Sequence, residues 1–275
     1  MRLSFLSLLL ALGLYAQSNN NPFYSKESIV NSITNTDYLA PNVIASIYGK
    51  NLSWEKAAVT DEDRQKGYLP LRPAGTVEVQ VAGSPVGLYY VSPEQINFLI
   101  PASLRAGTVE LRVVRQGAAG PTIKLTLRDS APSLFSVAQH ADGSLVSEEY
   151  PAQPGEWLVL YALGLGRTNG RVQDNQIPML SGFTLENLTI QRFDDLRITL
   201  NGEAIDSRRI AYAGLSPGFA GLYQINFQMP DEFPLGAEIC ITLGGESSPV
   251  TLKLPEPAPP VNSDAAAQPA AAAVR

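Results

Sequence analysis

Hydrophobic and polar positions alternate along this chain in short runs, separated by turn-forming residues. Residues 77–81 read Val-Glu-Val-Gln-Val, and residues 196–200 read Leu-Arg-Ile-Thr-Leu. A period of two places the apolar side chains on one face of a half-buried β-strand. Turn signals recur about every ten residues, and no sustained 3.6-residue pattern accompanies them. We therefore expect an all-β chain, with a helical turn only within residues 53–67.

The second half of the chain repeats the first. The segment Gln-Ile-Asn-Phe occurs at residues 95–98 and again at residues 224–227, and upstream of it residues 79–83 correspond to residues 198–202. The matched segments keep the same order in both halves, with insertions between them. Several short strands within about 100 residues per copy are typical of an immunoglobulin-like sandwich. The repeat therefore predicts two tandem immunoglobulin-like β-sandwiches.

The repeat also indicates the domain organisation. We expect the first sandwich, with an N-terminal lead, at residues 17–136, a linker at 137–149 and the second sandwich at 150–254. Residues 1–16 have the basic start, apolar run and small final residue of a secretory signal peptide, and the run is too short to span a bilayer. Residues 255–275 are rich in Pro and Ala and predict a disordered tail. The exported chain is expected outside the cell, at its surface or in the periplasm, with no transmembrane segment after signal cleavage.

Composition narrows the chemistry that the chain can perform. The 275 residues include one Cys and one His, and the formal net charge is −6. One Cys excludes an intramolecular disulfide and a Cys-rich zinc site, and His-dependent catalysis would rest on His140 alone. The basic residues form no cluster, so the sequence offers no basic surface that would attract the phosphates of a nucleic acid. Residues 61–63 and 194–195 are acidic but lack the spacing of a calcium loop, so we expect solvated charge, no metal and no cofactor.

A set of longer motifs resembles one protein family. These motifs are Tyr-Gly-x-Asn-Leu at 48–52, Tyr-Val-Ser-Pro-x-Gln-Ile-Asn-Phe-x-Ile-Pro at 90–101, Ala-Pro-Ser-Leu-Phe at 131–135, Pro-Gly-Glu at 154–156, Tyr-Ala-x-Gly-Leu-Gly at 161–166 and the segment 212–230. Together they are similar to the uncharacterised C-terminal domain, of the Solibacter type, found in many secreted proteins of soil acidobacteria. The resemblance covers about residues 28–254. It implies two IPT/TIG-like immunoglobulin-like sandwiches and brings no catalytic residues with it.

The duplicated amides are the most distinctive candidate residues. On a strand, Gln95 and Asn97 point to one side, as do Gln224 and Asn226 in the second copy. One interpretation is a polar pair displayed for a ligand. The other is a structural motif in which the amides tie adjacent loop or turn backbone. Because both copies keep the pair, and a binding site rarely needs duplication, we favour the structural role.

An insertion in the second copy provides the candidate ligand site. The loop at 214–223 is rich in Gly and Pro and holds two aromatic residues. Binding residues are often found on loops at the end of a sandwich. Phe219 and Tyr223, with Pro217 and Gly218 shaping the loop, could stack on a sugar or pack against a partner. The alternative is that the aromatic side chains cap this sandwich or fill the interface between the sandwiches.

Three further positions complete the candidate chemistry. Cys240 lies in an apolar strand, and we expect it to be a small buried side chain; His140 is expected to be exposed on a loop. Glu94 and Glu156 are the nominal carboxylate pair of a glycosidase, which would need to lie across one cleft. The prediction is a non-enzymatic binding or adhesion module whose partner is an extracellular polysaccharide or a surface protein. A structural spacer or assembly domain is the alternative, and a polymer hydrolase is the least supported interpretation.

Overall fold

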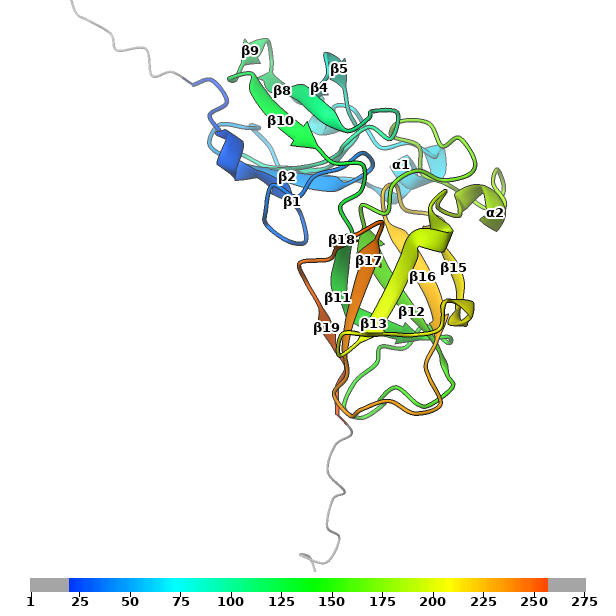
Figure 1. Ribbon diagram of the computed structural model, residues 1–275. Helices are drawn as coiled ribbons and strands as arrows, with labels where there is room; N and C mark the ends of the chain where they lie inside the picture. The colour runs from blue at the N-terminus through cyan, green and yellow to red at the C-terminus, as the bar shows by residue number, and fades with distance from the viewer. Residues whose placement is uncertain (1–19, 257–275) are drawn as a thin grey trace, which may run out of the picture.

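The computed structural model describes residues 20–256, so the predicted signal peptide at 1–16 and all but the first residues of the predicted tail lie outside the described residues. Figure 1 shows two bodies of β-strands, the first half of the chain forming one and the second half the other. Residue 20 and residue 256 lie at opposite ends of the molecule. No helix within the described range is long and apolar enough to cross a membrane.

The first sandwich consists of two antiparallel sheets. Its strands are β1 (Ile29–Asn31), β2 (Ile44–Tyr48), β3 (Ala57–Ala58), β4 (Val77–Val81), β5 (Ser84–Pro85), β6 (Leu88–Val91), β7 (Gln95–Leu99), β8 (Gly107–Arg115), β9 (Ala118–Ala119) and β10 (Ile123–Leu127). One sheet has the order β1-β2-β7-β6-β3 and the other β10-β8-β4-β5, with β9 paired to β8. Its helical elements are η1 (Lys26–Ser28), α1 (Asp61–Lys66) and η2 (Pro73–Gly75).

The second sandwich is built in the same way. Its strands are β11 (Ser133–His140), β12 (Trp157–Leu163), β13 (Leu196–Leu200), β14 (Glu203–Ala204), β15 (Ile210–Leu215), β16 (Tyr223–Gln228), β17 (Glu238–Leu243), β18 (Glu246–Ser247) and β19 (Leu252–Lys253). One sheet has the order β11-β12-β16-β15 and the other β14-β13-β17-β18, with β19 paired to β17. Its helical elements are α2 (Leu185–Leu188), η3 (Phe193–Asp195) and η4 (Ser207–Arg209).

The strand order confirms the predicted immunoglobulin-like fold. When the main strands of each half are lettered A to G in chain order, one sheet reads A-B-E-D and the other contains C, F and G. This is the arrangement of a constant-type immunoglobulin domain. In the first sandwich the seven strands are β1, β2, β4, β6, β7, β8 and β10, and in the second they are β11, β12, β13, β15, β16, β17 and β19. The Gln-Ile-Asn-Phe segments thus occupy strand E of both sandwiches.

Each sandwich encloses its own apolar core, as the alternating pattern predicts. Along β16 buried residues alternate with half-buried ones, and Phe227 is fully buried among the side chains of both sheets. Phe98 takes the same place on β7 in the first core. Burying a large apolar side chain contributes about 1.5–3 kcal/mol. Two apolar cores therefore stabilise the chain without a disulfide, and Leu163 of β12 extends into the first of them.

The boundary between the sandwiches differs from the expected one. Strand β10 ends at Leu127 and β11 begins at Ser133, so residues 137–140, expected in the linker, are strand residues, and 138–140 pair with β12. Leu134 and Ala138 of this strand belong to the core of the second sandwich. The connecting residues are themselves held, since the Ala131 N–H donates to the Gly164 carbonyl at 2.9 Å. The turn signals after β11 mark a hairpin inside the second sandwich and not a linker.

The expected helical turn is α1, and its local sequence accounts for it. The Thr60 hydroxyl accepts a hydrogen bond from the Asp63 N–H at 3.2 Å, and the Asp63 carboxylate accepts from the Thr60 N–H at 2.9 Å. This reciprocal pair is a capping box, and Gly67 ends the helix in a left-handed conformation (φ 77°). The hydrogen bonds from Thr60 lower the pKa of the Asp63 carboxyl below its usual value. Asp63 therefore caps a helix.

Candidate functional site

The loop expected to bind a ligand joins the two sandwiches instead. Tyr223 is fully buried (0% exposed), so the prediction that it stacks on a ligand is wrong. Its hydroxyl donates to the Gly166 carbonyl and accepts from the Asn42 amide at 2.9 Å. Asn42 belongs to the first sandwich, so this tyrosine bonds across the junction. Burial raises the pKa of the Tyr223 hydroxyl above its ordinary value.

The rest of this loop also contacts the first sandwich. Phe219 is 43% exposed, and the guanidinium of Arg64, in α1, lies 5.3 Å from its ring centre. Pro217 and Gly218 are half-buried, and the Gly218 N–H donates to the carbonyl of Pro178 at 2.7 Å. Of the predicted loop residues, Phe219 alone offers substantial exposed apolar surface. The alternative interpretation, an interface between the sandwiches, describes the loop better.

A small apolar cluster lies under this loop. Leu69 and Leu99 of the first sandwich pack there with Ile177 and Ala220 of the second. Gly221 permits the close approach: a Cβ atom there would lie 2.4 Å from a Leu99 methyl group, and its φ of +75° is a conformation that favours glycine. Side chains from both halves of the chain thus share one buried cluster.

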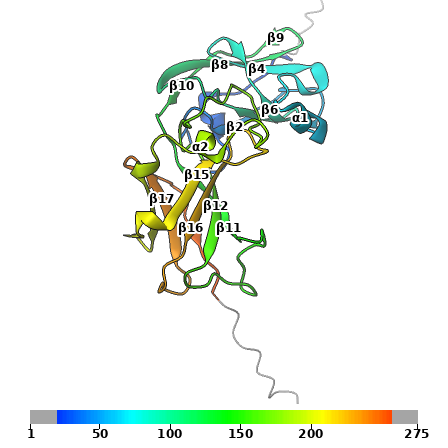
Figure 2. The ribbon, with the colours of Figure 1, turned by 90° about the vertical axis from the view of Figure 1, so that its right-hand side faces the viewer.

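The long connections between strands B and C meet at the same place. The first runs from β2 to β4 and the second from β12 to β13. The Leu69 N–H donates to the Asn175 carbonyl at 2.9 Å, and the Ile177 N–H donates to the Gly67 carbonyl at 2.8 Å. In both views α2, on the second connection, lies at the level where the sandwiches meet (Figures 1 and 2). Equivalent segments of the two copies therefore hydrogen-bond to each other.

The duplicated amides bond to each other along strand E. The Gln95 amide donates to the Asn97 side-chain oxygen at 2.8 Å, and the Gln224 amide donates to that of Asn226 at the same distance. All four side chains are half-buried on the face opposite the core. Asn97 also accepts from the Ser46 hydroxyl of β2 at 3.0 Å. These bonds join side chains of neighbouring positions and strands, and not the loop backbone that we expected.

A groove opens beside this junction. A cavity of about 680 Å³ is lined by Pro41, Asn42, Ala102, Ser103 and Arg105 of the first sandwich and by residues 166–174, Gln191 and Leu215 of the second. A second cavity of about 450 Å³ shares Pro41, Arg105, Gly166, Arg167 and Gln191 with it. We call the two together the junction groove. Sequence reasoning missed it because its walls come from both copies of the repeat.

Hydrogen bonds hold the wall of the groove that the second sandwich provides. The Gln191 N–H donates to the Arg167 carbonyl at 2.8 Å, and its amide donates to the Thr168 carbonyl at 3.0 Å. The Gly170 N–H donates to the Asn187 carbonyl at 2.7 Å. A Cβ atom on Gly170 would lie 2.7 Å from that of Asn187, so this close packing requires glycine. The loop is therefore anchored before any ligand arrives.

Further bonds cross the groove from one sandwich to the other. Both oxygens of the Asp174 carboxylate are occupied by Ser103, through its N–H at 2.9 Å and its hydroxyl at 2.6 Å. The Arg167 guanidinium donates to the Leu104 carbonyl at 3.0 Å. These contacts fix the spacing between the walls.

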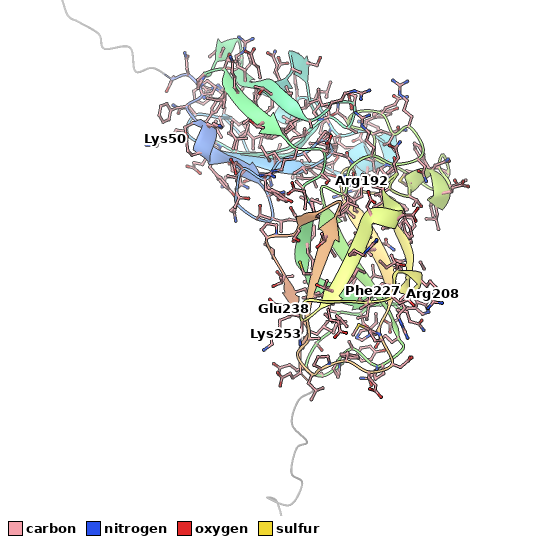
Figure 3. All side chains as sticks on the ribbon, in the orientation of Figure 1. Lys50, Arg192, Arg208, Phe227, Glu238 and Lys253 are labelled. Carbon is pink, nitrogen blue, oxygen red and sulfur yellow. The ribbon has the colours of Figure 1, made fainter. Side chains whose placement is uncertain are left out.

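Positive charge dominates the groove. Its basic residues are Arg105, Arg167, Arg171 and Arg192, and its acidic residues are Asp129 and Asp174. Arg192, labelled at the junction in Figure 3, is paired with Asp195 at 2.8 Å. Within residues 20–256 the side chains of Arg105 and Arg171 have neither a hydrogen bond nor an ion pair with another residue, and both are exposed. The chain as a whole is acidic, with a net charge of −6, so this local excess is distinctive.

The structure does not bring the nominal catalytic carboxylates together. Glu94 precedes β7 in the first sandwich, whereas Glu156 precedes β12 in the second. Glu156 is bonded to His140, which is 2% exposed, so the prediction of an exposed histidine is wrong. His140 ends strand β11, stacks on Tyr150 with ring centres 3.7 Å apart, and contacts the Tyr150 carbonyl through Nε2 at 3.0 Å. It closes the end of its own sandwich.

Cys240 is half-buried and not fully buried as expected. Its neighbours Ile239 and Ile241 point into the core, so strand alternation turns the thiol to the other face. Partial burial raises the pKa of the thiol, which keeps it protonated and unreactive near neutral pH. No group of three or more His, Cys, Asp or Glu side chains within the described range could hold a metal ion.

Comparison with known proteins identifies no family. No protein-family model and no curated protein matches the chain. Among solved structures, the surface glycan-binding protein PbSGBP-B from Prevotella bryantii aligns over 78% of this chain and 37% of its own, with 14% identity and a TM-score of 0.26. The SGBP-B of a Bacteroides ovatus mixed-linkage glucan utilization locus, in complex with a mixed-linkage heptasaccharide, aligns over 81% and 43%, with 10% identity and a TM-score of 0.32.

The tandem Ig repeats of Dlar align over 79% of this chain and 89% of their own, with 11% identity and a TM-score of 0.20. The chain spans less than half the length of the two glycan-binding proteins. At these scores the likenesses carry no assignment of function. The immunoglobulin-like fold is established by the strand order of each sandwich.

Proposed function

We propose that this chain is a secreted, non-enzymatic binding module whose ligand occupies the junction groove. The observation that carries the proposal is the groove itself, because two connected cavities of about 680 and 450 Å³ lie between the sandwiches. Ligand sites in proteins commonly have volumes of about 300–1,000 Å³ and form where two domains meet.

The anchoring of the walls supports a binding role. Asp174, Arg167 and Gln191 are each tied to backbone or side-chain partners that keep the groove open. A site that is already ordered loses less conformational entropy when a ligand binds. We propose an extracellular polysaccharide as the partner, in keeping with the export signal expected at residues 1–16. A surface protein is the alternative partner.

Blocking the groove tests the proposal. Ala102 lines the groove and is half-buried, so Ala102→Trp should fill it and abolish retention of the mature protein on polysaccharides of bacterial and plant cell walls. Ala211→Trp is the matched control, because Ala211 is exposed on β15 and does not line the groove. Near-ultraviolet circular dichroism checks that both variants fold. Equal retention of the two variants, or no retention of the unaltered protein on any polysaccharide or extracellular protein fraction, would refute the proposal.

The second candidate function is a structural spacer or assembly domain. The paired B–C connections favour it, because they hold the two sandwiches in one arrangement. A spacer would be unaffected by Ala102→Trp but would fail when the junction is disrupted. Membership of the acidobacterial domain family stays a prediction, and it is compatible with either function.

A further inference from the structure

We infer that the junction groove selects an acidic polysaccharide, whose carboxylates bind Arg105 and Arg171. This inference rests on the proposed function and adds the chemical class of the ligand. Arg105 comes from the first sandwich and Arg171 from the second, and both line the larger cavity. A chain lying in the groove would therefore meet one free guanidinium from each copy of the module.

The first argument is that, among the described residues, two arginines of the groove are not already bonded to another residue, whereas the other two are. Arg192 is neutralised by Asp195, and Arg167 donates to a carbonyl across the junction. Within the part of the chain that the structure describes, Arg105 and Arg171 have no such partner. An arginine offers a planar fork of N–H donors that matches the two oxygens of a carboxylate. Such charge-assisted hydrogen bonds are shorter and stronger than those between neutral groups.

The second argument is that the groove has few carboxylates of its own to compete with a ligand. Among the described residues, Asp174 is the one acidic residue lining the larger cavity, and Ser103 already occupies both of its oxygens. Asp129 lines only the smaller cavity. A ligand carboxylate near Arg105 and Arg171 would therefore meet little competition from the protein's own carboxylates.

The third argument is the absence of aromatic side chains. None of the described residues that line the junction groove is Phe, Tyr or Trp. A neutral sugar is generally held by an aromatic ring beneath its apolar face, together with a few polar groups. Here the lining instead offers exposed amide groups, those of Asn169 and Gln173, beside the arginines. This combination suits a sugar that carries hydroxyls and a carboxylate.

The same lining disfavours other anionic macromolecules. Single-stranded nucleic acid is bound by stacking bases on aromatic side chains along a basic track, and the groove has no such platform. The core of a protein interface is enriched in aromatic residues and depleted of charge. Both alternatives become outcomes of the experiment below.

The experiment measures binding of the mature chain to oligogalacturonate by titration calorimetry. The fully methyl-esterified form of the same oligosaccharide keeps the sugar but removes the charge. The variant is Arg105→Gln with Arg171→Gln. The control is Arg208→Gln with Lys253→Gln, which removes two positive charges toward the end of the second sandwich that faces away from the first (Figure 3). All four side chains are exposed, so both double variants are expected to fold.

We expect oligogalacturonate to bind at least about tenfold more tightly than its methyl ester, because esterification removes the charge-assisted hydrogen bonds between the carboxylates and the arginines. The groove variant should lose at least about tenfold in affinity, the control should bind like the unaltered protein, and added salt should weaken binding. Equal binding of the methyl ester, or unchanged affinity in the groove variant, overturns the inference.

Further ligands separate failure of the inference from failure of the proposed function. If a neutral glucan or xylan oligosaccharide binds and Ala102→Trp blocks it, the acidic specificity is wrong but the groove remains a polysaccharide site. If a single-stranded oligonucleotide or polyglutamate binds as tightly as oligogalacturonate, the selection of a polysaccharide is wrong. If no polysaccharide of either kind binds, both the inference and the proposed function fail.

Discussion

The two sandwiches have the same order of main strands and differ in the connection between strands D and E. In the first, β6 and β7 are joined by a tight turn in which the Ser92 N–H donates to the Gln95 carbonyl at 2.8 Å. In the second, β15 and β16 are joined by residues 216–222, which reach the first sandwich. The loop that lengthened in one copy therefore holds the two copies together. Extra length in a duplicated module can create a junction as readily as a ligand site.

The connections between strands B and C also differ between the two sandwiches. In the first sandwich this connection carries α1, and in the second it carries α2 and the anchored wall of the groove. The sheets beneath them keep equivalent pairings, such as Tyr48 with Gln95 and Tyr161 with Gln224. Differences in the connections, and not in the sheets, account for the junction and its groove.

The largest effects are expected from emptying either core. Phe98→Ala and Phe227→Ala should each lower the free energy of unfolding by about 3–5 kcal/mol, through lost burial and the cavity left behind. Each sandwich holds one tryptophan, Trp54 in the first and Trp157 in the second. Variants that retain only one of the two report the unfolding of each half by fluorescence. Because the junction is extensive, we expect the two halves to unfold together; two well-separated transitions would contradict a fixed junction.

Disrupting the junction itself should come next in size. Gly221→Ala adds a methyl group 2.4 Å from a Leu99 side-chain carbon, at a φ of +75°. We expect a loss of about 2–4 kcal/mol, from the left-handed backbone and the overpacking together. Gly218→Ala is the matched control, because its φ is +88° but a Cβ atom there has nothing within 4 Å. The control should lose only about 1–2 kcal/mol in the same denaturant titration.

The buried tyrosine of the junction should make stability depend on alkaline pH. Burial raises the folded-state pKa of Tyr223, so its stabilisation is complete below the unfolded value of about 10 and is lost as the pH rises further. At neutral pH, Tyr223→Phe should cost about 1–3 kcal/mol, because Gly166 and Asn42 lose their partner.

When the pH is raised from neutral to alkaline, Tyr223→Phe should also lose less stability than the unaltered protein does. Melting temperatures measured across this range check both effects. Tyr48→Phe, which alters an exposed tyrosine of β2, should follow the unaltered protein throughout. An unchanged alkaline loss in Tyr223→Phe would show that other groups cause it.

The smallest effect tests the equivalence of the two copies. Gln95→Ala and Gln224→Ala each remove one side-chain hydrogen bond of 2.8 Å on strand E. Each should lower the free energy of unfolding by about 0.5–1.5 kcal/mol. Neither should change retention on polysaccharide. Loss of binding in one variant only would mean that this copy of the motif displays its amides for a ligand.

The predictions from sequence succeeded where a pattern is local. Alternation over residues 77–81 and 196–200 predicted the C strands, and the repeated Gln-Ile-Asn-Phe predicted equivalent E strands. They failed for His140, which was expected on an exposed loop, and for the ligand-stacking role considered for Tyr223, because the structure buries both residues. In both residues the covering partner is supplied by another segment, Asn42 for the tyrosine and Tyr150 for the histidine.

By itself, the sequence determined the strands, the duplication and the two apolar cores, because a period of two decides which side chains share a face of a sheet. Only the tertiary structure decided the junction and its groove. A local pattern specifies which face a residue takes but not which distant segment covers that face. Arg105 and Arg171, far apart in the chain, line one cavity only because the two sandwiches pack together in this arrangement.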